Sequence, residues 1–298
     1  MDTIRIHDGQ AQAVIVPGLG GGLARYDWRG PCGPIPVFRP CEDLSRANPF
    51  SLACNLLVPW SNRISQGGFP YGGEFHRLNP NLPGEPFPIH GNGFQEAWAV
   101  EEHEVASARL SLSSDGPGPF RYEAAVDYKL QDGCLAIRLT VRNRRDIPLP
   151  YGLGLHPWFP RSRGTLLQAA ADVLWLEDER YLPAGSTSPL ARKGWDFSRF
   201  GPLPDGWINN GFTGWNGQAT ILWKDRSLQL DIEADPPLST YLVYSPSGSA
   251  DFFCFEPVTH PVDAHHLPGG PLQNGLVELA PGEELSVFTC FRPAAASP

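Results

Sequence analysis

The chain has 298 residues, of which 41% are hydrophobic and 11% aromatic, which is enough apolar material for a large core and too much for a disordered protein. Its formal net charge of -9 argues against the basic face by which nucleic-acid and anionic-membrane binders attract phosphate. We therefore expect a globular protein with neither of these partners, while length alone allows one domain or two.

The start of the chain shows no sorting signal. No apolar stretch follows a basic region in "MDTIRIHDG", and no run of about 18 apolar residues occurs in the sequence. These absences favour a cytoplasmic location. The cysteines form no C-x-x-C pair, so we expect reduced, partly buried thiols and neither a disulfide framework nor a zinc site. They are Cys32, Cys41, Cys54, Cys134, Cys254 and Cys290.

The first predicted elements are short strands. Apolar and polar residues alternate in "TIRI" and "QAVIV", and the glycine run "PGLGGGLARYD" follows from Pro17 to Asp27. Leu23 stands where the nucleotide-binding motif G-x-G-x-x-G needs its last glycine, and no helical pattern follows. We therefore predict a turn between two strands at this run, and no phosphate site.

A long segment without periodic structure extends from Pro59 to Val100. We expect it to form a loop with short hairpins that brings Arg63 and His90 onto a surface. Each residue alone has a plainer explanation, a surface ion pair for Arg63 and a turn position before Gly91 for His90. Nearby aromatic residues either offer apolar platforms to the C–H faces of a sugar or belong to the core. They are Trp60, Phe69, Phe94 and Trp98.

The clearest strand pair lies in the middle of the chain. In "CLAIRLTVR", residues 134–142, every second side chain from Leu135 to Val141 is apolar, as a half-buried strand requires. The segment before it, "FRYEAAVDYKL", also predicts a strand, and "QDG" predicts the hairpin turn between them. Similar short runs, separated by 32 glycines and 32 prolines, continue to the C-terminus. They predict an all-β sandwich or barrel, and since no linker or repeat divides the chain, we expect one domain over residues 1–298.

A single histidine, His156, lies in "PYGLGLHPWFP". Pro157 stops the strand and holds the preceding residue in extended geometry, and we expect the neighbouring glycines to leave room for a ligand and Trp158 to line a cleft. Taken alone, this histidine is more simply a core or rim residue at a strand end.

A carboxylate, Glu256, ends the apolar strand "DFFCFEPV" and is followed by Pro257, just as His156 is followed by Pro157. Such a group is either paired with a cation as a structural fixture or partly desolvated, which raises its pKa toward the range useful for a general base. A sandwich can bring the two strand ends to one rim. Glu256 and His156 are therefore a candidate proton-transfer pair.

The segment "HPVDAHH" follows, with His260, Asp263, His265 and His266. It can be drawn as a metal site, but a proline-bearing loop lacks an ordered scaffold for tetrahedral ligation. We favour neutral imidazoles that serve as hydrogen-bond partners near a polar pocket, and expect no metal.

Five segments resemble, in order and over most of the chain, the aldose 1-epimerase (galactose mutarotase) family. They are "NRI" followed by glycines and Phe69, "LNPNLPGEPFPIHG", "GLGLHPWF", "INNGFTGW" and "FCFEP". The resemblance implies a β-supersandwich with an open sugar cleft and no metal or organic cofactor. It also implies an activity, the interconversion of the α and β anomers of a free aldose by acid/base ring opening and reclosure.

The resemblance also implies roles for individual residues. Glu256 is the general base that takes the proton from the anomeric hydroxyl, and His156 is the general acid that protonates the ring oxygen. His90 is a second histidine near that oxygen, and Arg63 hydrogen-bonds sugar hydroxyls. Trp158 is expected to line the substrate cleft.

One departure from the family pattern concerns substrate preference. The family commonly has an aspartate where this sequence has Asn209, with Asn210 as the neighbouring alternative. An amide donates and accepts hydrogen bonds but is not a charged acceptor. The substitution therefore bears on which sugar is bound more than on the reaction.

Two other functions compete with a mutarotase. A sugar-phosphate (hexose-6-phosphate) 1-epimerase needs further basic residues at the cleft, for which Arg25 and Arg77 are candidates. A non-catalytic carbohydrate-binding protein on the same fold needs no proton-transfer groups, and the presence of His90, His156 and Glu256 together argues against it. Nothing in the sequence indicates an oligomeric state.

Overall fold

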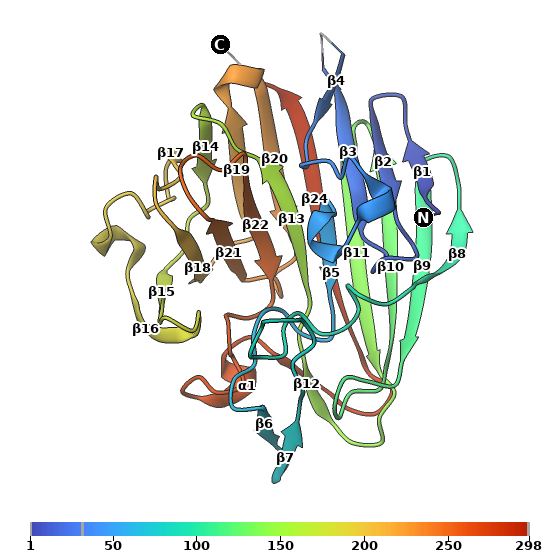
Figure 1. The fold of residues 1–298 in the computed structure, drawn as a ribbon, viewed down its shortest axis with the longest axis vertical. Helices are drawn as coiled ribbons and strands as arrows, with labels where there is room; N and C mark the ends of the chain where they lie inside the picture. Colours follow the sequence, from blue (N-terminus) through green and yellow to red (C-terminus); the bar gives the residue numbers. More distant parts are fainter. Residues whose placement is uncertain (1, 31–32, 297–298) are drawn as a thin grey trace.

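The computed structural model describes residues 2–30 and 33–296 (Figure 1). Two large sheets face one another across an apolar core, and each pair of neighbouring strands in the described residues is antiparallel. This arrangement confirms the predicted all-β sandwich. None of the described helices is both long enough and apolar enough to cross a membrane.

The first large sheet has eleven strands in the order β1-β2-β3-β5-β13-β22-β21-β18-β15-β16, with β4 paired to β3. Their bounds are β1 (Ile4–His7), β2 (Ala11–Ile15), β3 (Leu23–Gly30), β4 (Gly33–Pro36), β5 (Cys54–Leu57), β13 (Gly154–Pro160), β15 (Val173–Glu177), β16 (Pro183–Thr187), β18 (Ile208–Thr213), β21 (Thr240–Ser245) and β22 (Phe252–Val258).

The second large sheet has nine strands in the order β17-β14-β19-β20-β24-β11-β10-β9-β8. Their bounds are β8 (Ala99–His103), β9 (Ser107–Ser114), β10 (Tyr122–Gln131), β11 (Cys134–Asn143), β14 (Thr165–Gln168), β17 (Gly201–Pro202), β19 (Gln218–Trp223), β20 (Leu228–Ala234) and β24 (Glu284–Ala295).

The remaining elements are small. Two further sheets have two strands each, β6 (Gly68–Tyr71) with β7 (Glu74–Arg77) and β12 (Leu149–Tyr151) with β23 (Val277–Leu279). Helical structure in the described residues is limited to α1 (Gly270–Gln273) and the 3-10 turns η1 (Leu44–Arg46), η2 (Pro49–Ser51), η3 (Pro189–Ala191) and η4 (Lys224–Arg226). The segment from Pro59 to Val100 is thus mostly loop with the β6–β7 hairpin, as predicted.

The central hairpin forms where the alternation predicted it. In β11 the apolar side chains from Leu135 to Val141 are buried while Arg138 and Arg142 are exposed. The turn residues Asp132 and Gly133 have φ values of 53° and 79°, the left-handed backbone that a tight two-residue hairpin needs.

Aromatic residues join the two large sheets. Phe38, which follows β4, packs edge-on against Phe159 of β13 and Phe291 of β24, with ring centroids 5.2 and 5.0 Å apart. The hydroxyl of Tyr26 donates to the carbonyl oxygen of Gly133 at 2.7 Å, so a strand of the first sheet is tied to the hairpin of the second. These contacts fix the first large sheet, which carries the candidate site, against the second large sheet.

The glycine run between β2 and β3 is a turn, as predicted. Gly20 has a φ of 67°, and a Cβ there would lie 2.2 Å from the carbonyl oxygen of Phe94. The amide of Gly20 donates to the carbonyl of Glu96 at 2.8 Å. The run therefore lets the loop after His90 approach the sheet closely, which is a packing role.

The cysteine prediction is wrong for one pair. Cys134 of β11 and Cys290 of β24 form a disulfide, with Cα atoms 6.7 Å apart and a sequence separation of 156 residues. Sequence spacing did not indicate this pair because β11 and β24 become neighbours only through the topology of the second sheet. Cys41, Cys54 and Cys254 are free thiols, and Cys32 lies outside the described residues.

Candidate active site

A cavity of about 760 Å³ opens where β13, β18, β21 and β22 meet the long loop that follows β5. All six residues singled out from the sequence line it, although they come from distant parts of the chain. They are Arg63, His90, His156, Trp158, Asn209 and Glu256.

His156 and Glu256 meet on neighbouring strands. β13 and β22 pair with Gly154 opposite Val258, and this register sets the two titratable residues directly across from one another. The expectation that each proline ends its strand is wrong, because β13 continues to Pro160 and β22 to Val258. The pairing between the two strands is interrupted at this level, where Pro157 and Pro257 lack amide donors. The Nε2 of His156 lies 3.4 Å from the Oε1 of Glu256, and both side chains are less than a tenth exposed.

Burial shifts these two groups in opposite directions. Desolvation raises the pKa of Glu256 to about 8, although the positive charge of Arg63 acts to lower it. Desolvation lowers the pKa of His156 to about 4. Both shifts disfavour the charged form of the group. At neutral pH both groups are therefore uncharged: the carboxyl of Glu256 is protonated, and His156 is a neutral imidazole.

His90 is held by reciprocal hydrogen bonds with Asn62. The amide of Asn62 donates to the Nδ1 of His90 at 3.0 Å, and the amide of His90 donates to the carbonyl of Asn62 at 3.0 Å. Both residues have left-handed backbones, with φ values of 56° and 61°. Because Nδ1 accepts a hydrogen bond, the proton of the neutral ring is on Nε2. Burial holds the pKa of His90 well below its usual range, so this imidazole is a neutral donor.

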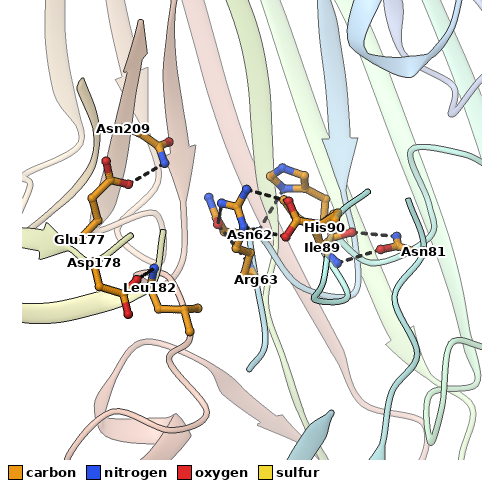
Figure 2. A network of polar contacts seen from close by, with 10 residues as sticks. Asn62, Arg63, Asn81, Ile89, His90, Glu177, Asp178, Leu182 and Asn209 are labelled. Atoms are coloured by element: carbon orange, nitrogen blue, oxygen red, sulfur yellow. Dashed lines mark hydrogen bonds and ion pairs between the residues drawn. The ribbon is translucent and has the colours of Figure 1, made fainter. Parts of the chain in front are cut away.

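Arg63 is held by a carboxylate that the sequence analysis did not single out. Its Nε and Nη2 donate to the two oxygens of Glu85 at 3.1 and 2.8 Å, which makes a bidentate ion pair. Both residues line the cavity, and Figure 2 labels Arg63 there. The guanidinium also lies 5.1 Å from the ring centre of Tyr181. Glu85 lies within the segment "LNPNLPGEPFPIHG", but no periodic pattern indicated that it would reach back to Arg63.

The segment "HPVDAHH" supports the loop that carries Arg63. The Nε2 of His260 accepts from the amide of Ser61 at 3.1 Å, and Asp263 accepts from the amide and hydroxyl of Ser65 at 2.8 and 2.7 Å. The predicted hydrogen-bonding role is confirmed for the imidazole of His260 and for that of His266, whose Nε2 lies 2.8 Å from the carbonyl oxygen of Gly68. It is wrong for His265, whose two ring nitrogens are buried without a partner in the described part of the chain.

One group of potential metal ligands lies at the site itself. Donor atoms of His156, Cys254 and Glu256 are within 4.8 Å of one another. Cys254, however, is fully buried and does not line the cavity, and burial together with the charge of Glu256 raises the pKa of its thiol well above the usual range. A protonated thiol is a poor ligand, and an ion there would occupy both proton-transfer groups. The donor set does not fit a resident metal.

The expectation that the glycines beside His156 leave room for a ligand is wrong. A Cβ at Gly152 would lie 2.3 Å from the ring of His260, and one at Gly154 would lie 2.6 Å from Val258. These glycines make room for neighbouring side chains and not for a ligand.

The aromatic residues of the long loop are likewise not sugar platforms. Trp60, Phe69, Phe94 and Trp98 are buried in the core. The exposed aromatic wall of the cavity consists instead of Tyr181 and Trp207, whose ring centroids are 5.6 Å apart and whose side chains are 41% and 42% exposed. No alternating pattern distinguishes these two residues from other loop aromatics.

Asn209, and not Asn210, faces the cavity. Asn210 is buried and donates to the carbonyl of Trp175 at 2.7 Å, whereas the Nδ2 of Asn209 donates to the Oε2 of Glu177 at 2.8 Å (Figure 2). A carboxylate thus lies immediately behind the amide that stands in the aspartate's place.

Comparisons with known proteins show what the chain as a whole is similar to. A family model described as aldose 1-epimerase matches residues 2–292. The uncharacterized protein YphB of Escherichia coli K12 is 35% identical over 269 residues, which cover 88% of this chain and 89% of that protein. The uncharacterized protein YihR of the same organism is 28% identical over 188 residues, covering 61% of this chain and 59% of that protein.

Solved structures show the same architecture. A crystal structure from Escherichia coli K12, provisionally named an aldose 1-epimerase, superposes with a TM-score of 0.90 at 31% identity and covers 99% of each chain. A GalM/aldose epimerase homologue from C. elegans superposes with a TM-score of 0.84 at 17% identity, again over 99% of each chain. The β-supersandwich expected from the sequence is confirmed.

Proposed function

The chain belongs to the aldose 1-epimerase family, and we propose that it interconverts the α and β anomers of a free aldose by acid/base ring opening and reclosure. The single observation that carries this proposal is the His156–Glu256 contact of 3.4 Å at a buried cavity wall. One proton on this pair supplies one acid and one base at the same place, which is what a hemiacetal needs to open.

The reaction balances with proton transfers alone. The base takes the proton of the anomeric hydroxyl, and the bond between the anomeric carbon and the ring oxygen breaks with its electrons on that oxygen. The acid then protonates the ring oxygen and leaves an open-chain aldehyde. The aldehyde rotates about its bond to the next carbon, and the same steps in reverse close the ring on either face. No cofactor is required for this sequence.

The proposed roles follow those implied by the resemblance. Glu256 acts as base and His156 as acid once the proton of the resting pair has moved from Glu256 to His156, and their contact provides a direct path. In the opposite direction the two exchange roles. The Nε2–H of His90 supports the oxygen that gains charge, and Arg63 and Asn209 bind hydroxyls at the cavity wall.

A free aldose is favoured over a sugar phosphate by the charges at the cavity. Arg63 is the one arginine or lysine among the described residues that line it, and Glu85 already holds its guanidinium. Arg25 pairs with Asp27 on β3, Arg77 lies on the β6–β7 hairpin, and neither lines the cavity. A phosphate would therefore meet a carboxylate beside the single cation.

The buried, incompletely hydrogen-bonded carboxyl of Glu256 favours catalysis over binding alone. A binding protein gains nothing from a buried carboxyl whose Oε2 has no hydrogen-bond partner within the part of the chain that is described. The predicted single domain, supported by the family match over residues 2–292, and the predicted cytoplasmic location remain part of the proposal.

The test is the equilibration of freshly dissolved pure anomers, followed by polarimetry or NMR, over a panel of free aldoses and their 6-phosphates. Glu256→Gln and His156→Asn are each expected to lower the rate about 10²–10⁴-fold. Glu233→Gln, which removes an exposed carboxylate on β20, is the matched control. Full activity in both site variants would refute the assigned roles, and a panel without any activity would favour a binding protein.

A further inference from the structure

Glu177 ends β15 and receives one hydrogen bond on each carboxylate oxygen. The Nε1 of Trp207 donates to Oε1 at 2.5 Å, and the Nδ2 of Asn209 donates to Oε2 at 2.8 Å. Both donors belong to residues that line the cavity. β15 pairs with β18 at Val173–Thr213 and Leu174–Phe212. The same register, continued beyond these pairs, brings Glu177 opposite Asn209, in agreement with their hydrogen bond.

This contact fixes which end of the Asn209 amide is free. A carboxylate only accepts hydrogen bonds, so the nitrogen of the amide must face Glu177. The Oδ1 of Asn209 is then the end of the amide that points away from Glu177. Asn209 thus presents an acceptor to the cavity, and the negative charge lies one side chain further back.

The guanidinium of Arg63 lies near the Glu177–Asn209 pair. Arg63 acts on the carboxyl of Glu177 as a nearby positive charge, and Figure 2 shows its guanidinium between the Glu177–Asn209 pair and His90. The ion pair of Arg63 is with Glu85, whose two oxygens both accept from the guanidinium. The cavity wall on this side therefore combines the amide oxygen of Asn209, which is backed by Glu177, with a cation that is already paired, and it is suited to the hydroxyl donors of a neutral sugar.

We propose that Glu177 is a specificity-determining positioning residue, which acts through Asn209 to select uncharged polyhydroxylated sugars with a hydroxyl donor at this wall. The inference rests on the proposed function of the same site. Glu177 fixes the amide so that Oδ1 accepts from the sugar, and its charge disfavours anionic substituents there.

A double-mutant cycle tests this role. Glu177→Gln removes the charge and allows the Asn209 amide to turn, so KM for a free aldose is expected to rise about 10-fold with kcat within about 2-fold, the scale of one hydrogen bond to a charged group. Asn209→Asp sets two carboxylates at the 2.8 Å contact and is expected to raise KM further. In the double variant the new amide on β15 donates to one oxygen of the new carboxylate on β18. The other oxygen of that carboxylate then faces the cavity as an acceptor, so KM is expected to return to within about 3-fold of wild type.

The control and the contrary outcomes are distinct. Glu179→Gln removes an exposed carboxylate two residues away and is expected to leave KM unchanged. Two outcomes in an active wild type would show that the role of Glu177 is wrong while the proposed function stands. In one, the two single effects simply add in the double variant; in the other, kcat and stability fall while KM does not change. If wild type turns over no aldose, the proposed function fails and this inference fails with it.

Discussion

The imidazole of His156 is stacked on the indole of Trp158, with ring centroids 5.2 Å apart and planes inclined by 19°. Trp158 is only 7% exposed, and the guanidinium of Arg39 lies 4.5 Å from its ring centre. The indole therefore lines the cavity with a small part of its surface and is mainly a wall for the histidine. Its role in substrate binding stays a prediction, and the stacking predicts a second role, in holding the proposed acid.

Replacement of Trp158 is expected to affect kcat more than KM. Trp158→Phe keeps an aromatic wall behind His156 and is expected to cost less than about 10-fold in kcat, whereas Trp158→Ala frees the imidazole and is expected to cost about 10²-fold, as misplacement of a catalytic group does. Initial rates over a range of aldose concentrations measure both constants. An alanine variant with raised KM and unchanged kcat would instead identify Trp158 as a sugar contact.

His90 is expected to stay a neutral donor throughout the working range. Its Nδ1 accepts from Asn62, and burial holds its pKa well below the usual range, so the ¹⁵N shifts of its ring should report Nε2–H and an unprotonated Nδ1 at neutral pH and at the ordinary pKa of a histidine. His90→Ala is expected to lower kcat about 10²-fold, the usual loss for one donor to a developing charge. A ring that becomes doubly protonated near pH 6.5 would contradict this assignment.

The rate is expected to be level between two limits of pH. The pair holds one proton between the pKa of about 4 for His156 and the pKa of about 8 for Glu256, and only this form contains both an acid and a base. Above about pH 8 the acid is lost, and below about pH 4 the base is lost. A profile of kcat/KM against pH measures these as values of the pair. A rate that climbs steadily above pH 8 would show that free Glu256 carboxylate alone is required.

The sequence predicted the strands and the proton-transfer pair for physical reasons. Alternation makes β10 and β11 evident. The residues before Pro157 and Pro257 stand out for a reason that the structure does not bear out, because both strands continue through the proline. The placement of His156 beside Glu256 needed only the pairing of two strands. The family resemblance supplied their roles.

The remaining site residues depend on contacts that no local pattern encodes. Glu85 approaches Arg63 because a loop folds back, and Glu177 meets Asn209 because β15 joins the sheet beside β18. The Cys134–Cys290 disulfide likewise depends on the position of β24 beside β11. Such pairs are separated by many residues and appear only when the topology is known.

Glu256 is expected to destabilise the fold as pH rises. Its folded pKa is raised above that of the unfolded chain, so between about pH 4.5 and 8 the folded state binds more protons and the free energy of unfolding falls as pH increases. Glu256→Gln removes this titration. One pKa unit corresponds to about 1.4 kcal/mol, and most of the rise from 4.5 to about 8 falls within this range, so the variant is expected to gain about 3–4 kcal/mol relative to wild type between about pH 5 and 8. Urea unfolding at the two pH values measures this difference, and a constant difference would contradict it.

His260 is expected to be a structural support whose loss reaches the cavity. It accepts the amide proton of Ser61, which is fully buried, so His260→Ala leaves that donor without a partner and is expected to lower the free energy of unfolding by about 1–3 kcal/mol. The loop from Ser61 carries Arg63, and its loosening is expected to raise KM as well. His7→Ala, which removes an exposed imidazole from β1, is the matched control for stability and KM. Nε2 is the accepting atom, and the amide oxygen of His260→Gln can accept in its place, so this variant should recover part of both effects. Equal losses in the alanine and glutamine variants would mean that packing of the ring, and not the hydrogen bond, supports the loop.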